Sequence, residues 1–254
     1  MFTLFETPNW FAGFDLVLDT IALLVTILIS SYGYKLFKIS DDKKFAYFSL
    51  AFALMSIGFL FKLITYMVVY SSSTRHVAAV TIITVTGMSD VGISLRDLMY
   101  RTGFFIQMAA TLGSLLLLYL LSQRSRDRLK KFHEVSQIGL SLYFVLLISI
   151  VSTFKYFIFY LTSIVLLALI VLHYYQNYLR KKSKSSKQVF IGFCFLLAAQ
   201  PFFVFIFAAN WFYFIAEVLT LVSFAMIAKV YIQVNAQQKR VSSIDKMKIE
   251  GEMD

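Results

Sequence analysis

Seven apolar stretches, each long enough to cross a lipid bilayer, restrict the fold of this chain more than any other feature. A transmembrane helix needs about 20 predominantly apolar residues, because the hydrocarbon core is about 30 Å thick and a helix rises 1.5 Å per residue. The stretches cover residues 11–34, 45–70, 99–121, 136–152, 156–178, 189–208 and 211–231. We therefore predict an all-α membrane protein, a seven-transmembrane-helix bundle with a very tight turn at Asn210 between the last two spans.

Composition supports a single domain within the membrane. Apolar residues make up 59% of the chain and charged residues 15%, whereas soluble domains are about half apolar and a quarter charged. Seven helices use most of the 254 residues, so we assign residues 1–232 to one transmembrane domain. The remaining basic and polar tail, residues 233–254, is shorter than the roughly 50 residues at which folded domains begin.

Positive charge is distributed unequally between the two sides of the spans. Nineteen of the 24 lysines and arginines cluster at residues 35–44, 124–131, 180–187 and 229–248, all on one side. Cytoplasmic loops retain lysine and arginine, so we predict an extracellular N-terminus, a cytoplasmic C-terminus and a multi-pass protein of the cell membrane. The net charge of +10 does not indicate nucleic-acid binding, because the cations form short runs instead of one face. We expect the bilayer as a partner, and a cytoplasmic protein at the basic loops.

The long connection at residues 71–98 is extracellular in this orientation. Its β-branched stretch at 80–86 predicts either a short strand or hairpin over the bundle, or an irregular cap on the helix ends.

Two spans share a short sequence pattern. The segments FIQMAATLGS from Phe105 and FIAEVLTLVS from Phe214 agree at Phe-Ile, at Thr-Leu and at the final Ser. A three-plus-one-plus-three parallel repeat would explain this agreement, since parallel repeats are one way in which transporter bundles are built. Chance similarity between two apolar segments explains it as well.

This architecture resembles the one shared by microbial rhodopsins and by the sugar transporters with Pro-Gln loops. The resemblance covers the whole chain but is one of topology. A rhodopsin carries its retinal lysine near the middle of the seventh span, whereas Lys229 lies at the cytoplasmic boundary here. The Pro-Gln motif is absent, because Gln200-Pro201 has the reverse order. Membership of neither family is expected.

A layer of polar residues in the outer half of the bundle is the candidate site. Ionisable residues inside a bilayer are rare and usually face the bundle interior. Counting from the outer end of each span places one charged or amide residue on each of five helices, roughly 9–12 Å below the surface. The predicted ligand-binding residues are Asp15, Asp19, Lys62, Tyr66, Gln107, Gln200 and Glu217. Pro201 follows Gln200 and predicts a helix kink there, because proline removes a backbone donor.

Two interpretations of this layer remain open. In the first, Lys62 pairs with Asp19 or Glu217 in a buried lock that fixes helix register. In the second, the layer is the floor of a pocket that binds a small polar or charged ligand from outside. Three carboxyl groups against one lysine leave an excess of negative charge, which requires a cation, a proton or water and favours the pocket.

Catalysis has no sequence support. No HExxH motif, Ser–His–Asp arrangement or glycine-rich phosphate loop is present. We therefore expect no enzyme activity, no cofactor and no metal. We predict a ligand-binding protein of sensor or receptor type. A small-solute or ion transporter and a structural accessory subunit with an ion-pair lock are the alternatives.

Overall fold

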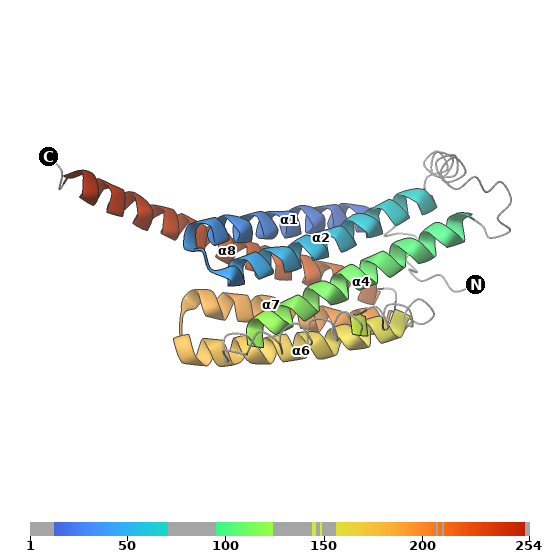
Figure 1. The fold of residues 1–254 in the computed structure, drawn as a ribbon. Helices are drawn as coiled ribbons and strands as arrows, with labels where there is room; N and C mark the ends of the chain where they lie inside the picture. The colour runs from blue at the N-terminus through green and yellow to red at the C-terminus, as the bar shows by residue number, and fades with distance from the viewer. Residues whose placement is uncertain are drawn as a thin grey trace.

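Long helices account for almost all of the structure. The computed structural model describes residues 13–70, 95–123, 144–145, 148, 156–206, 208–209 and 211–251. Its main helices are α1 (Phe14–Ser40), α2 (Lys43–Tyr70), α4 (Leu95–Gln123), α6 (Tyr156–Lys181), α7 (Lys184–Val204) and α8 (Trp211–Gly251) (Figure 1). Each of these six contains a segment that is long and apolar enough to cross a membrane. The chain is therefore an all-helical, multi-pass membrane protein.

The predicted fourth span, residues 136–152, lies almost entirely outside the described residues. Within it, Val145 is buried against Phe104 of α4 and Phe159 of α6. The count of seven helices, the orientation and the repeat stay predictions. The connection at 71–94, with its predicted strand, and the turn at Asn210 also lie outside the part of the chain that the structure describes.

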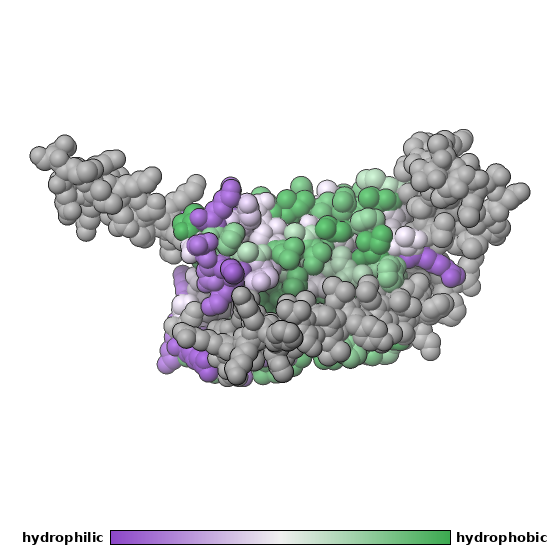
Figure 2. All heavy atoms as spheres, viewed as in Figure 1, coloured by the Kyte–Doolittle hydropathy of each residue, from purple (hydrophilic) through white to green (hydrophobic). Residues whose placement is uncertain are grey.

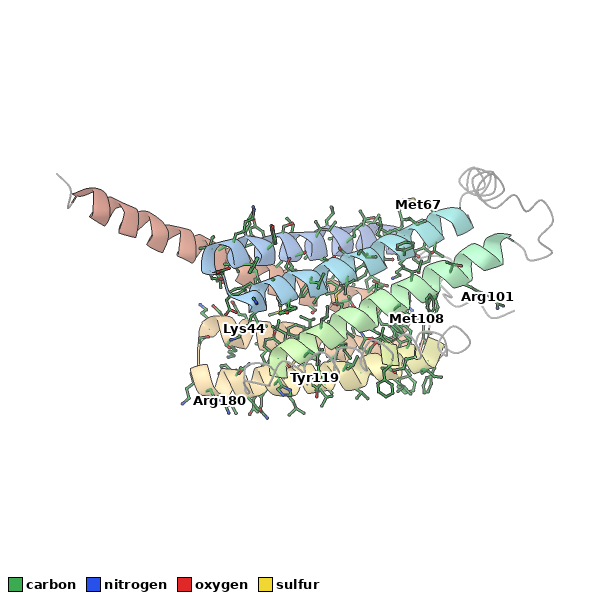
Figure 3. All side chains as sticks on the ribbon, viewed as in Figure 1. Lys44, Met67, Arg101, Met108, Tyr119 and Arg180 are labelled. Atoms are coloured by element: carbon green, nitrogen blue, oxygen red, sulfur yellow. The ribbon has the colours of Figure 1, made fainter. Side chains whose placement is uncertain are left out.

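The six helices form a ring in which each contacts its neighbours in chain order. α1 packs on α2, α2 on α4, α4 on α6, α6 on α7 and α7 on α8, and α8 closes the ring against α1. Two short connections, at residues 41–42 and 182–183, join α1 to α2 and α6 to α7 at one end of the bundle. Lys44 and Arg180 lie at this end, which we call the basic end, whereas Met67 and Arg101 lie toward the other (Figure 3). Side chains from all six helices therefore share a common interior.

The helices extend further at the basic end than the apolar stretches predict. α1 continues six residues beyond Tyr34 to Ser40, where Asp41 adopts a left-handed conformation and donates its backbone N–H to Phe37 O at 2.8 Å. Across the bundle, the Ser183 hydroxyl caps α7 by accepting from the Ser186 N–H at 3.2 Å. A helix can continue beyond the membrane surface because its backbone hydrogen bonds also form there. The long basic side chains of its last turns then reach water. Hydrophilic side chains gather at this end, beside the hydrophobic belt (Figure 2).

The predicted tail is a continuation of the last span, because α8 runs without interruption to Gly251. Asn235 is buried and donates its amide N–H to Tyr32 O of α1 at 3.4 Å. α8 therefore stays against the bundle to this level, and its final part projects beyond the other helices (Figure 1).

Aromatic side chains of α2 and α8 meet in the half of the interior near the basic end. Phe48 stacks on Tyr231 with ring centroids 4.3 Å apart, and Phe52 meets Phe224 edge-on at 6.4 Å. Phe59 meets the same Phe224 at 5.7 Å. These five residues, the aromatic core, connect α2 with α8 across the bundle. Phe48, Phe52 and Phe224 are almost completely buried.

Close packing of α2 on α4 requires a glycine. A Cβ at Gly103 would collide with the Thr65 hydroxyl, whose proton is donated to Phe61 O of its own helix at 2.8 Å. We expect Gly103→Ala to lower the free energy of unfolding by about 1–3 kcal/mol, as overpacking does. Thermal unfolding in detergent would measure this change.

The control for this prediction lies on the same helix. Within the described part of the chain, a Cβ at Gly113 would meet only Leu54 Cδ1, at 4.0 Å, so Gly113→Ala should leave stability unchanged or slightly improved. Adding Thr65→Ala to Gly103→Ala should restore most of the loss. Equal stabilities of the two alanine variants would contradict the close approach.

Candidate functional site

Three charged side chains meet in the interior, far from the basic end. Lys62 Nζ of α2 lies 2.8 Å from Asp19 Oδ1 of α1 and 2.8 Å from Glu217 Oε1 of α8. All three are buried, with 6%, 0% and 3% of their surface exposed, respectively. We call them the ion triad. α1 brings its carboxylate to this point because it packs against both α2 and α8.

The charges of the ion triad do not cancel. Two carboxylates and one ammonium leave a net charge of −1 when all are ionised, and an uncompensated charge is costly at this depth. Asp19 Oδ2 is buried and has no hydrogen-bond partner among the described residues. Asp15, one turn away, is also buried and accepts the backbone N–H groups of Gly13 and Leu16 at 3.0 and 2.8 Å. When its members are all ionised, the triad therefore attracts an additional positive charge.

Two tyrosines lie beside the lysine. The hydroxyl groups of Tyr66 and Tyr213 are 3.0 Å apart, and both side chains are buried. Lys62 Nζ lies 5.8 Å from the ring centroid of Tyr66 and 6.0 Å from that of Tyr213, distances at which a cation is attracted to an aromatic ring. The rings therefore help to hold the ammonium in place.

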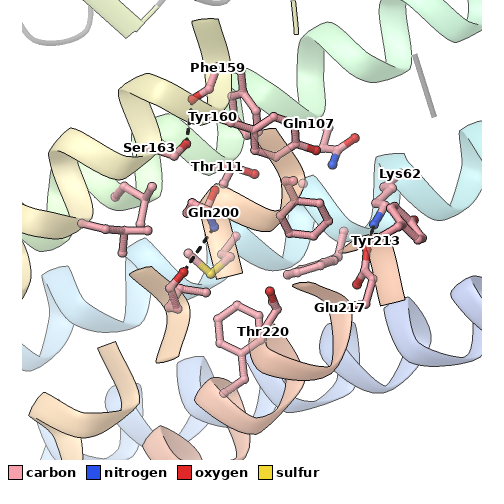
Figure 4. A pocket seen from close by; sticks show the side chains of 18 residues that line it. Lys62, Gln107, Thr111, Phe159, Tyr160, Ser163, Gln200, Tyr213, Glu217 and Thr220 are labelled. Carbon is pink, nitrogen blue, oxygen red and sulfur yellow. Dashed lines mark hydrogen bonds and ion pairs between the residues drawn. The ribbon is translucent and has the colours of Figure 1, made fainter. Parts of the chain in front are cut away.

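A cavity of about 80 Å³ opens beside the ion triad, between α2, α4, α6, α7 and α8 (Figure 4). Lys62 and Glu217 form one wall, and Phe224 of the aromatic core lines it as well. Asp19 does not line it. The other polar residues that do are Gln107, Thr111, Tyr160, Ser163, Gln200, Tyr213 and Thr220. We call this space the central cavity.

Hydrogen bonds within the helices leave oxygen acceptors for the central cavity. Ser163 donates its hydroxyl proton to Phe159 O at 2.9 Å, and Thr220 donates to Ala216 O at 2.8 Å. Gln200 uses its amide N–H on Leu196 O at 3.4 Å. A hydroxyl that donates in this way retains its lone pairs, and an amide oxygen can only accept. Together with the Glu217 carboxylate, these groups present mainly acceptors.

The size of the central cavity restricts its contents. One water needs roughly 10–15 Å³ of cavity volume. A cavity of about 80 Å³ therefore accommodates several waters or one small solute. Sites for drug-sized ligands measure about 300–1,000 Å³. A large organic ligand would require the helices to separate.

The predicted residues are distributed over two adjoining environments. Gln107, Gln200 and two members of the ion triad, Lys62 and Glu217, line the central cavity, while Asp19 and Tyr66 lie against Lys62. Asp15 is outside the cavity lining. Pro201 lies in the last turn of α7, which ends at Val204, four residues before the predicted end of that span.

Sequence reasoning missed the hydroxyl residues and Tyr213. Thr111 and Thr220 occupy corresponding positions of the two similar segments, and both line the central cavity. Ser114 and Ser223 also correspond, and both are completely buried with hydroxyls that lack a partner within the described ranges. The shared Thr and Ser positions were therefore a usable signal. Tyr213 could have been found one turn before Glu217.

The described residues contain no group of three or more His, Cys, Asp and Glu side chains arranged to hold a metal ion. His173, the histidine for which the structure gives contacts, bonds to Leu169 O of its own helix at 2.9 Å. Cys194 is partly exposed and does not line the central cavity. The chemistry of the site is therefore that of a carboxylate, an ammonium, amides and hydroxyls.

The chain belongs to a family described as "Family of unknown function (DUF6962)", whose model matches residues 20–239. The match begins directly after Asp19 and includes the other two members of the ion triad and every other residue that lines the central cavity. No curated protein and no solved structure matches the chain.

Proposed function

We propose that this member of the DUF6962 family binds a small polar or charged solute in the central cavity and acts as a sensor-like membrane protein. The observation that carries the proposal is the set of polar side chains that face one interior space from five helices. Pockets of this type combine an apolar lining with a few convergent polar groups.

The central cavity distinguishes a binding site from a structural lock. A lock requires only the ion triad, in which Lys62 joins α1, α2 and α8. Gln107, Ser163 and Gln200 belong to the other three helices and are not among the contacts of Lys62. Buried polar groups that face an open space need water or a solute as a partner. A bound solute would be the hydrogen-bond partner of these residues.

The aromatic core favours sensing over transport. Alternating access requires a path from the site to both sides of the membrane. Among the residues that the structure describes, Phe52 and Phe224, which are 0% and 2% exposed, fill the interior between the central cavity and the basic end. With the predicted orientation, solute enters from outside, and the basic cytoplasmic ends of the helices contact a partner protein.

Transport is the second candidate, and Pro201 favours it. This residue interrupts the hydrogen bonding of α7 beside Gln200, three residues before the helix ends. Broken helices at a central site are a feature of many transporters.

Thiol accessibility tests whether water reaches the central cavity. In a Cys194→Ala background, Thr220→Cys places a thiol in the cavity lining, and Thr26→Cys places one at a buried position of α1 outside it. Only the thiolate reacts, so modification requires hydration. We expect Ag⁺, a thiol reagent small enough for this cavity, to modify Thr220→Cys at least tenfold faster than Thr26→Cys in proteoliposomes. Equal, negligible rates would indicate a dry lock and overturn the proposal.

The side from which the reagent acts separates the two candidates. For a sensor, modification of Thr220→Cys occurs from one side of the membrane only. Modification from both sides would indicate alternating access and replace sensing with transport.

A further inference from the structure

We propose that the solute bound in the central cavity is a small monovalent cation, either an alkali-metal ion or ammonium. This inference rests on the proposed function, because it names the ligand class of the same site.

Charge is the first reason. With all three groups ionised, the ion triad has a net charge of −1, and its members are at most 6% exposed. Asp19 Oδ2 has no hydrogen-bond partner among the described residues, so its charge is only partly compensated. In an environment of low dielectric constant, one bound monovalent cation makes the triad neutral. An anion would increase the imbalance.

The arrangement of the ion triad leaves one carboxylate for the solute. Asp19 binds Lys62 at 2.8 Å but does not line the central cavity. Glu217 both binds Lys62 through Oε1 and lines the cavity. Asp19 therefore holds the lysine from outside the cavity, and Glu217 is the carboxylate that a cation in the cavity can reach. If Lys62 were paired with Glu217 alone, its ammonium group and the bound cation would compete for the same carboxylate.

The remaining lining supplies neutral oxygen ligands. Ser163 and Thr220 use their hydroxyl protons on their own helices, so their oxygen lone pairs remain available. Gln107, Gln200 and Thr111 add two amide groups and one further hydroxyl to the same lining. Alkali-metal ions and ammonium both bind to oxygen acceptors. A cavity of about 80 Å³ holds such an ion with some of its waters, but not a bulky organic cation.

Thermal unfolding of the purified chain in detergent tests this inference. Sodium, potassium, ammonium and N-methyl-D-glucamine chlorides are compared at one ionic strength and one pH. A ligand that binds only the folded state stabilises it by mass action. We expect at least one of the three small cations to raise Tm by roughly 2–4 °C or more relative to N-methyl-D-glucamine. A shift with sodium or potassium indicates an alkali-metal site, and a shift with ammonium alone indicates an ammonium site.

Matched variants locate the effect. Thr220 and Thr26 are both buried, and both donate to the carbonyl one turn earlier in their helices. Only Thr220 lines the central cavity. Thr220→Val should weaken the cation-dependent shift at least threefold, Thr26→Val should leave it unchanged, and Glu217→Gln should abolish it. Equal shifts in the two threonine variants would place the cation elsewhere and overturn the inference.

Other outcomes separate this inference from the proposed function. If Thr220→Cys is hydrated but Tm is the same in all four salts, the solute is not a small cation and the proposed function remains. If acidification stabilises the chain equally in every salt, a proton neutralises the ion triad, and the cation assignment is wrong. If Thr220→Cys is not modified at all, both proposals fail.

Discussion

Replacing Lys62 with methionine is expected to lower the free energy of unfolding by about 3–5 kcal/mol, the cost of removing one partner from a buried ion pair. The substitution keeps the size of the side chain but leaves Asp19 and Glu217 without the ammonium that lies 2.8 Å from each. Two uncompensated carboxylates would then remain in the bilayer interior, 0% and 3% exposed. Thermal or SDS-induced unfolding of the purified chain would measure the loss.

A combined variant distinguishes the loss of charge balance from a general packing defect. Lys62→Met together with Asp19→Asn and Glu217→Gln removes every charge of the ion triad, so stability should return to within about 1 kcal/mol of the original chain. Lys229→Met, an exposed lysine of α8, serves as the control and should have little effect. A triple variant as unstable as Lys62→Met would contradict this account of the triad.

Replacing Phe52 with alanine is expected to destabilise the protein by about 3 kcal/mol. Phe52 is 0% exposed, and its ring lies 4.8 Å from that of Phe48 and 6.4 Å from that of Phe224. Truncation of a buried phenylalanine leaves a cavity and costs about 3–5 kcal/mol in soluble proteins. The lower end of that range applies here, because lipid removes most of the transfer contribution while the lost packing remains.

The matched control is a phenylalanine on the outside of the bundle. Phe157 of α6 is 45% exposed. In Phe157→Ala, lipid fills the space that the ring leaves, so Tm should change little. Unfolding of both variants in the same detergent makes the comparison. Equal losses for Phe52→Ala and Phe157→Ala would mean that the aromatic core does not hold α2 against α8.

The polar layer was predictable because charged residues are conspicuous in apolar helices. Lys62 and Glu217 each interrupt a long apolar stretch, and a constant rise of 1.5 Å per residue converts position into depth. The partners of Lys62 were not predictable to the same degree. Periodicity does not state which helices are neighbours, and both carboxylates reach the lysine because the ring closes through α8 and α1.

Helix ends were less predictable than helix centres. Apolar composition ends near Tyr34 and Tyr178, but α1 and α6 continue to Ser40 and Lys181. Hydropathy indicates which residues lie in lipid, whereas the end of a helix is set by its last backbone hydrogen bonds. Two connections predicted as basic loops are accordingly short, and most of their cations belong to helix ends.

The central cavity could not be predicted from sequence. Its volume depends on how rings such as Tyr160 and Phe203, which stack with centroids 5.1 Å apart, fill the space between helices. Threonine and serine are common in membrane helices, so Ser163 stood out in no way, and the pattern shared by Thr111 and Thr220 did not indicate a cavity by itself. Only the helix arrangement brings their hydroxyls to one space.

A high-resolution electron cryomicroscopy map of the chain in a lipid nanodisc, with a bound antibody fragment, would test the central claim most directly. We expect Lys62 between Asp19 and Glu217, and separate density for water or an ion among Glu217, Gln107 and Gln200. A lysine directed toward lipid, or glutamine side chains that fill the space between α4 and α7, would contradict a solute site in this bundle.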